Sequence, residues 1–261
     1  MSSTFWDSIR HLSGWGWALG EIKRNPRIID ARGPRWGETA LHWAALGNLE
    51  ATETLCQSNP HLLSILDAHD RSPLDWVVEK MFFLRQAQAG ELDEERRRSE
   101  SLLAPARACA LFILGWISAH GPQNVWSGDP VRFVQVALAA GELEVAIMGE
   151  SVGGRRHGVE IWLGGLAAFW HSRKAVEAYL DHLASSHAIT GESVVFGRPL
   201  GLHVAHLWAT GAIDAVRAQW FHESGARLDQ ETASESIETF CSADGAAGAA
   251  RLDALIKQIG C

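Results

Sequence analysis

Hydrophobic positions follow a helical spacing in residues 37–55, GETALHWAALGNLEATETL. Leu41, Ala44 and Ala45 stand at i, i+3 and i+4, so they fall on one face of a helix. Thr39 precedes them at the place of an N-cap or first-turn residue. The pattern predicts a short helix after Thr39, and its small alanines would let a partner helix approach closely.

The same pattern predicts where further helices begin and end. Gly47 or Asn48 can take the left-handed conformation that stops a helix, and a second helix is expected over about residues 49–57. Residues 102–118 are mostly apolar and predict a long core helix. The mixed charges of residues 90–100 are typical of a solvated helix face, and the alternative is an exposed docking helix.

Two short patterns occur twice at nearly the same distance. TALHWA at residues 39–44 is followed 33 residues later by SPLDWV at residues 72–77. NPRII at residues 25–29 returns as NPHLL at residues 59–63. A proline after a polar residue disfavours continuation of a helix, so each NP pair is expected where a second helix ends and an extended finger loop begins. A fixed period favours stacked helix pairs.

The period and the hexapeptide resemble the ankyrin repeat, whose signature is T-P-L-H-x-A. The first copy matches at four positions: Thr39, Leu41, His42 and Ala44. The second copy keeps or conservatively replaces three: Ser72, Pro73 and Leu74. It departs from the signature at Asp75, which stands in the place of the histidine. The resemblance implies that His42 holds its turn through hydrogen bonds to neighbouring backbone, which is a structural role.

The resemblance implies an all-α fold, an ankyrin-repeat-like solenoid of stacked helix pairs with short finger loops and a helical insertion. The repeats are clear over residues 25–79 and degenerate over residues 125–232, where VQVALAAGELEV at residues 134–145 is a weaker copy. The remaining segments complete one continuous domain: residues 1–24 as an N-terminal helical cap, 80–124 as a helical insertion with the charged run, and 233–261 as a C-terminal cap.

Composition and net charge limit the kinds of function that this chain is expected to have. The 261 residues include 47% hydrophobic and 21% charged residues, which is typical of a globular protein. The formal net charge of -8 argues against a nucleic-acid partner, which needs a basic surface, and would suit a basic protein partner. The N-terminus has no long apolar stretch, and the longest apolar run, residues 108–118, is too short to span a bilayer. We therefore expect a cytoplasmic protein without a membrane partner.

Enzyme chemistry has little support in the sequence. It contains no P-loop, G-x-S-x-G or H-E-x-x-H motif, so we expect neither an enzyme nor a bound cofactor. The cysteines lack the spacing of a zinc site or a disulfide framework: Cys56, Cys109, Cys241 and Cys261. The alternative is a metal-dependent enzyme in the divergent C-terminal half, with His203 and His206 on one helix and a third ligand from His171 or His222. The simpler interpretation is one motif histidine and one surface histidine.

In the ankyrin family, partners usually contact the finger loops and the end of the first helix of each pair. The resemblance places partner-binding residues at eight positions: Arg35, Trp36, Glu38, Leu46, Ala68, His69, Arg71 and Glu79. A tryptophan beside an arginine has the composition of a binding hot spot, although Trp36 could instead pack between fingers. Three further candidates are Trp126, before the third copy, and Arg155 and Arg156 in a glycine-rich loop that could bind an acidic group.

These patterns predict a protein-binding scaffold of bacterial type that recognises one protein through a concave face. Small ankyrin-repeat proteins of this kind often serve as immunity proteins that cover the active site of a secreted toxin. The acidic charge would match a basic toxin. The alternatives are a host-directed effector and an assembly factor that bind another protein.

Overall fold

The structure is a computed structural model. It describes residues 3–88, 93–121 and 126–153, and beyond these only residues 161–162, 178–179, 181–183, 185, 194–195, 198–209, 215–223, 225–226, 250 and 254. The chain divides into two compact units, Met1–Arg156 and His157–Cys261, and each is described by itself. The range 125–232, which the sequence grouped as one segment, therefore spans the division between two units. The described residues are mostly helical, which confirms the expected all-α class.

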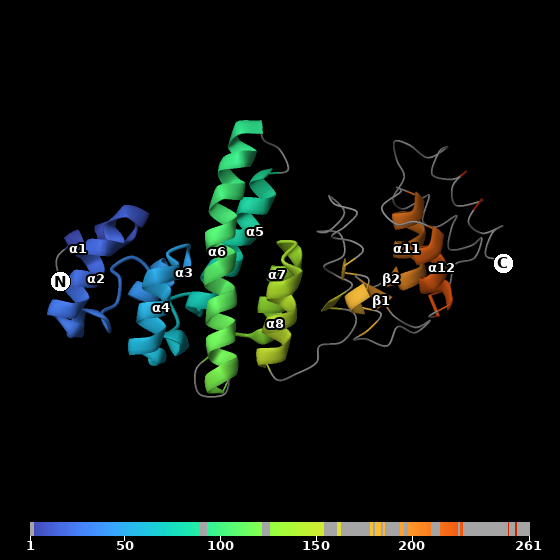
Figure 1. Cartoon of the computed structure of the whole chain (residues 1–261). Helices are drawn as coiled ribbons and strands as arrows, with labels where there is room; N and C mark the ends of the chain where they lie inside the picture. Colours follow the sequence, from blue (N-terminus) through green and yellow to red (C-terminus); the bar gives the residue numbers. More distant parts are fainter. Residues whose placement is uncertain are drawn as a thin grey trace. The chain divides into compact units, whose positions relative to one another are not determined.

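Eight α-helices make up the described part of the first unit. Their bounds are α1 Ser3–Ile9, α2 Trp15–Arg24, α3 Ala40–Ala45, α4 Leu49–Ser58, α5 Pro73–Gln88, α6 Asp93–His120, α7 Pro130–Ala139 and α8 Leu143–Gly153. Each odd-numbered helix packs against the next one in the chain, and the four resulting pairs follow one another from left to right in Figure 1.

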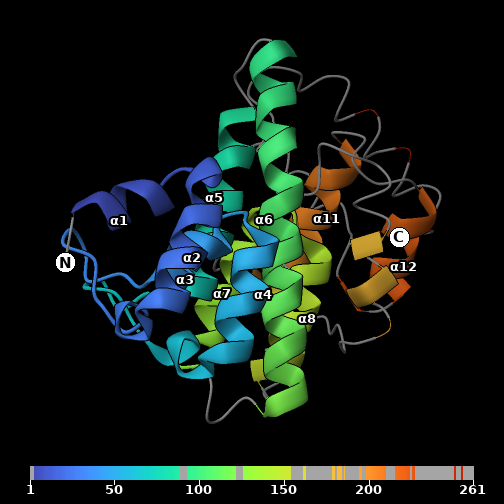
Figure 2. The same cartoon turned by 60° about the vertical axis from the view of Figure 1, so that its left-hand side comes forward.

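The last three pairs stack in two rows. Helices α3, α5 and α7 lie in contact in one row, and α4, α6 and α8 lie in contact in the other. Figure 2 shows these helices from a second direction. Apolar side chains from both rows are fully buried, among them Leu41, Val77 and Val134 from the first row and Leu55, Ile113 and Ala146 from the second. The core of this unit is therefore the layer between the rows.

The two sequence copies have the same local geometry. Gly37 and Asp70, 33 residues apart, both have positive φ angles, of 67° and 57°. Helices α2 and α4 both end just before an Asn-Pro pair, at Asn25 and Asn59, and each pair opens a short 3₁₀ helix, Pro26–Ile28 and Pro60–Ser64. The repeat recognised in the sequence is thus a repeat of backbone conformation as well.

Gly37 supplies the first test of this geometry. Replacing Gly37 with alanine should lower the free energy of unfolding by about 1 kcal/mol, because a side chain is disfavoured at positive φ. The matched control is Gly16→Ala in α2, where an added methyl group would meet open space. This change should raise the free energy of unfolding by up to about 1 kcal/mol, since alanine favours a helix. Urea unfolding of the full chain measures both free-energy changes. Equal effects of the two substitutions would contradict the positive φ angle assigned to Gly37.

The third pair, α5 and α6, is longer than expected from the sequence. Helix α5 begins at the second motif and continues to Gln88, so the expected boundary at residue 80 falls inside this helix. Helix α6 packs against α5, so it completes the third pair where an insertion between two halves was expected. With 28 residues, α6 is about 42 Å long, against about 15 Å for α4. Figures 1 and 2 show α5 and α6 rising beyond the neighbouring helices.

Helix α6 also contains the one described stretch, Ser101–His120, that is long and apolar enough to cross a membrane. Its buried residues recur at helical spacing: Leu103, Ala106, Ala110, Ile113 and Ile117. This face packs against α4, α5 and α8. A core helix passes the same test of length and composition, so this stretch is weak evidence for a membrane span.

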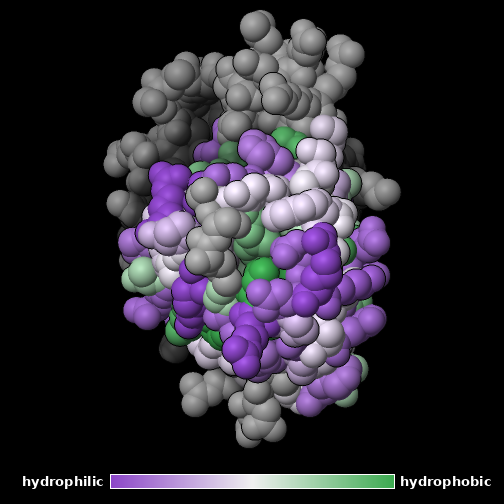
Figure 3. Space-filling model, turned by 90° about the vertical axis from the view of Figure 1, so that its left-hand side faces the viewer, coloured by the Kyte–Doolittle hydropathy of each residue, from purple (hydrophilic) through white to green (hydrophobic). Residues whose placement is uncertain are grey.

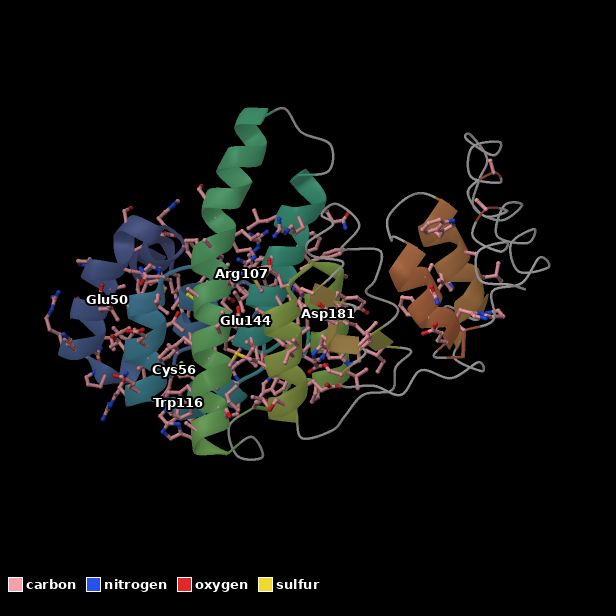
Figure 4. All side chains as sticks on the ribbon, turned by 45° about the vertical axis from the view of Figure 1, so that its right-hand side comes forward. Glu50, Cys56, Arg107, Trp116, Glu144 and Asp181 are labelled. Atoms are coloured by element: carbon pink, nitrogen blue, oxygen red, sulfur yellow. The ribbon has the colours of Figure 1, made fainter. Side chains whose placement is uncertain are left out.

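A buried ionic cluster joins three helices of this stack. Glu142, just before α8, is 3% exposed. Its carboxylate oxygens accept hydrogen bonds from Nε and Nη2 of Arg107 on α6, at 2.5 and 2.7 Å, and from Nη2 of Arg85 on α5, at 3.4 Å. Figure 4 labels Arg107 on α6 and Glu144, the exposed neighbour of Glu142, on α8. The cluster fixes α8 against α5 and α6.

Helices α1 and α2 close one end of the stack. Phe5, Ile9 and Trp15 are buried, and α1 also contacts α3. Seen from that end, the surface is mainly hydrophilic, with small hydrophobic patches (Figure 3). A polar outer face is what a terminal repeat needs, and the assignment of residues 1–24 as a cap stays a prediction.

The described residues of the second unit include one helix pair. Two short strands, β1 Val194–Val195 and β2 Arg198–Pro199, pair antiparallel and lead into α11, Leu200–Ala209. Helix α11 contacts α12, Ala215–Glu223. This small strand pair was not expected from the sequence. The proposed C-terminal cap, residues 233–261, lies almost wholly outside the described residues.

Candidate functional site

Two finger loops precede the first helices of the second and third pairs. The first finger loop, residues 32–38, is closed by the N–H of Gly33, which donates to the carbonyl of Glu38 at 2.6 Å. The second finger loop, residues 67–71, is closed by the N–H of Asp67, which donates to the carbonyl of Arg71 at 2.9 Å. The N–H of Ala68 donates to the carbonyl of Trp36 at 2.7 Å, so the loops lie side by side.

His42 connects the start of α3 to the second finger loop. The N–H of the N-cap residue Thr39 donates to Nδ1 of His42 at 3.0 Å, and Nε2 lies 3.1 Å from the carbonyl oxygen of Arg71. Because Nδ1 accepts, Nε2 carries the proton and donates to that carbonyl. The bonds to backbone that the motif implies are present, and the ring is fully buried. Burial lowers the pKa of His42 from 6.5 to about 4.

Protonation of His42 should make the fold sensitive to acid. In the unfolded chain the imidazole has its ordinary pKa, so the unfolded state binds the proton first as the pH falls. About 3 kcal/mol of stability, fully present above pH 6.5, should be lost by about pH 4. The variant His42→Asn keeps an acceptor near the Nδ1 position and does not titrate.

We expect His42→Asn to be about 1 kcal/mol less stable than wild type near pH 7, because it loses the bond to the Arg71 carbonyl. The difference should vanish or reverse at pH 4. Urea unfolding at several pH values checks this, and parallel pH profiles for the two proteins would count against it.

Asp75 takes the place of His42 in the second copy. One carboxylate oxygen, Oδ2, accepts from the N–H and the hydroxyl of Ser72, at 2.8 and 2.6 Å. Burial raises the pKa of Asp75, while the hydrogen bonds from Ser72 act in the opposite direction. A carboxylate oxygen can therefore replace the imidazole nitrogen as acceptor at the start of this helix, and the departure from the ankyrin signature leaves the turn intact.

Three tryptophans pack between the finger loops and the first helices. The ring of Trp76 meets those of Trp36 and Trp43 edge-to-face, with centroids 5.6 and 5.3 Å apart. The imidazole of His42 lies 5.1 Å from the same ring. The indole N–H of Trp76 donates to Asp67 at 2.8 Å. Trp76 is therefore the centre of the contact between the two copies.

An ion-pair network borders the tryptophans. Arg71 donates to Asp67 through Nε and Nη2, at 2.9 and 2.7 Å, and to Glu79 through Nη1, at 3.1 Å. Arg132 on α7 donates to Glu79 at 2.7 Å. Burial raises the pKa of Asp67, but the hydrogen bonds from Arg71 and Trp76 outweigh burial and lower it to about 2. Asp67 is thus ionised at neutral pH, and the network holds the second finger loop onto α5.

A groove of about 400 Å³ opens beside this network. It is lined by Trp36, Arg71, Trp76, Glu79, Lys80, Phe83 and Leu84. Phe83 is 65% exposed, the largest exposed fraction among the large hydrophobic residues in the described part of the chain. The ammonium group of Lys80 donates to the carbonyl oxygen of Leu46 at the end of α3, and burial lowers its pKa. An apolar surface edged by fixed charges is typical of a protein-binding site.

Several residues expected to bind a partner lie at or near this groove. Arg35, Ala68 and His69 are exposed in the finger loops. The guanidinium of Arg35 stacks over the ring of Trp36, 4.2 Å from its centroid. Trp36 is half-buried: it packs on Trp76 and also lines the groove. The two interpretations left open by the sequence, packing between finger loops and contact with a partner, are therefore compatible.

Glu38 corrects the list of expected contact residues. Its side chain is fully buried, and it accepts hydrogen bonds from the Trp36 N–H at 2.9 Å and the Trp43 indole at 3.3 Å. It lies so close to Gly33 that a methyl group there would collide with its carboxylate. Glu38 therefore organises the first finger loop and is not available to a partner.

Other expected contact residues have internal partners. Trp126 packs edge-to-face on Phe133, with centroids 5.5 Å apart, and its indole N–H points to the Ser72 hydroxyl at 3.4 Å. Leu46 is half-buried. Arg71 and Glu79 line the groove but are already ion-paired, as above. Arg155 and Arg156 lie outside the described residues.

Four groove residues were missing from the expected contact residues: Trp76, Lys80, Phe83 and Leu84. The expected end of the repeats at residue 79 placed the last three in an insertion. Trp76, Lys80 and Phe83 stand at i, i+4 and i+7, which is one face of a helix. Helical spacing continued past residue 79 would therefore have pointed to this face.

No group of three or more His, Cys, Asp and Glu side chains could hold a metal ion among those the structure describes. His171 and the side chain of His206 lie outside the described residues, so the alternative metal site is not tested. Cys56 and Cys109 are free and buried, and burial raises the pKa of the Cys56 thiol to about 12. Such a thiol is a poor nucleophile.

Comparisons with models of protein families, with curated proteins and with solved structures found no match for this chain.

Proposed function

We propose that this chain is an ankyrin-like repeat protein that binds another protein through the groove between its finger loops and α5. The observation that carries the proposal is Phe83, an exposed aromatic side chain beside a groove lined by Trp36 and Trp76. Aromatic residues and arginine are enriched among the residues that dominate binding energy. A large exposed phenylalanine beside other aromatic rings is costly in water, and a partner that covers it would remove that cost.

The repeat geometry supports the same proposal. Two copies 33 residues apart share a positive-φ loop residue, a capped first helix and a tryptophan that donates to a loop carboxylate, Glu38 or Asp67. This regularity makes the finger loops rigid, so a partner meets a preformed surface. Preformed surfaces bind with a smaller ordering cost.

Replacing Phe83 with aspartate tests the proposal. We expect at least a 30-fold loss of affinity for the partner, because a charge replaces an apolar side chain that lines the groove. Stability should change by less than about 0.5 kcal/mol, since the side chain is mostly exposed. The measurement is affinity capture from the source cells with the tagged full chain, followed by titration of the captured protein.

The matched control is Leu49→Asp, which introduces the same charge at another exposed apolar residue, on α4 in the other row. This variant should bind like wild type. Equal capture by wild type and Phe83→Asp would show that the groove is not the binding surface.

For the cellular role, we propose the one that the sequence predicts, a cytoplasmic immunity protein that blocks a secreted toxin. Co-expression should then protect cells from that toxin, and Phe83→Asp should abolish the protection. Failure of the wild-type chain to protect would leave the effector and assembly roles as the candidates for the same binding surface.

A further inference from the structure

The charges around the groove differ in sign from the charge of the whole chain. The chain has a formal net charge of -8. The groove and the side chains bonded to its lining residues contribute four cations, Arg35, Arg71, Lys80 and Arg132, and three carboxylates, Glu38, Asp67 and Glu79. The groove therefore has an excess of positive charge on an acidic protein.

The carboxylates at the groove are already engaged. Glu79 receives two guanidinium groups, Asp67 receives Arg71 and the Trp76 indole, and Glu38 is enclosed in its loop. The exposed carboxylate of the second finger loop, Asp70, does not line the groove. A basic segment entering the groove would therefore compete with existing ion pairs to gain a carboxylate partner.

The cations, by contrast, include two without a carboxylate partner in the described part of the chain. Lys80 donates to a backbone carbonyl, and Arg35 stacks on Trp36. A guanidinium that lies face-on to an indole keeps its N–H edge available, and that edge matches a carboxylate with two parallel hydrogen bonds. Arg35 is exposed, so a partner can reach it without any rearrangement.

We propose that the groove binds an acidic, apolar segment of the partner protein, with an apolar side chain against Trp76 and Phe83 and a neighbouring carboxylate on Arg35. The inference rests on the proposed function and names the chemistry of its partner. It proposes an acidic partner segment in place of the basic protein partner expected from net charge, because local charges at an interface decide which segment it accepts.

A photo-crosslinking residue at position 83 tests the proposal directly. Phe83 is replaced by p-benzoylphenylalanine in the full chain, which leaves an exposed aromatic ring in place. The chain is irradiated in the source cells, and mass spectrometry identifies the crosslinked segment. We expect a segment of another protein that has an apolar residue within about four positions of Asp or Glu and a net negative charge.

Charge reversal then tests the proposed contact between Arg35 and a carboxylate of the partner. Arg35→Glu should weaken binding of the captured partner about tenfold, and replacing the partner's carboxylate with lysine should restore it. The control Arg27→Glu makes the same change at an exposed arginine away from the groove and should alter binding less than twofold.

The outcomes separate this inference from the proposed function. A crosslink to a net-basic segment, or to a second copy of this chain, overturns the acidic-segment proposal. Unchanged binding by Arg35→Glu does the same, while loss of binding by Phe83→Asp still supports the groove. Absence of any crosslink, together with full binding by Phe83→Asp, overturns both.

Discussion

Replacing Glu142 with alanine should lower the free energy of unfolding by about 2 kcal/mol. The substitution removes the buried carboxylate that Arg107 and Arg85 share, and it leaves two guanidinium groups whose side chains are 38% and 25% exposed. Removing one partner of a partly buried ion pair is destabilising, because the remaining charges keep part of their desolvation penalty. Urea unfolding of the full chain at neutral pH measures the effect.

Glu144 provides the control for this prediction. It lies two residues away on α8 (Figure 4) and is exposed, so Glu144→Ala should change stability by less than about 0.5 kcal/mol. The double variant Glu142→Met, Arg107→Met should recover part of the loss, since it removes a charge from each side. A loss below about 1 kcal/mol for Glu142→Ala would mean that the cluster does not hold α8.

Replacing Trp76 with alanine should cost about 4 kcal/mol. Its ring is 7% exposed and meets two tryptophans and His42, so the substitution leaves a cavity at the contact between the two copies. It also removes the indole N–H that donates to Asp67. Urea unfolding monitored by circular dichroism measures the loss without relying on the removed fluorophore.

Two variants separate the contributions to this loss. Trp76→Phe keeps an aromatic ring but loses the hydrogen bond to Asp67, and it should cost about 1 to 2 kcal/mol. Trp17→Ala removes a tryptophan that is 43% exposed and should cost less than about 1 kcal/mol. Similar losses for Trp76→Ala and Trp17→Ala would contradict the central place of Trp76.

The sequence predicted those features that depend on a few neighbouring residues. The cap at Thr39, the stop at Gly47 and the helix that follows it are set by local backbone preferences, and the structure has them at the expected places. The 33-residue repeat was visible because each copy needs the same residue types at its turn.

Features that depend on tertiary packing were not predicted. The sequence shows Glu38 as a charged residue in an exposed loop, and only the folded positions of Gly33 and Trp43 show that it is enclosed. Likewise α5 extends past residue 79 because α6 packs along it, and this extension places Phe83 beside the groove. Net charge does not describe the groove, because a sum over the chain does not show where Arg35 and Lys80 lie.

Hydrogen exchange of the full chain, with and without its captured partner, tests the central claim most directly. The account predicts that binding slows exchange in peptides that cover the two finger loops, residues 32–38 and 67–71, and α5 around residues 76–84. Peptides from α2 and α4 should exchange equally in both states. Protection confined to α2, α4 or the unit His157–Cys261, with no change in the finger loops, would contradict the assignment of the groove as the binding surface.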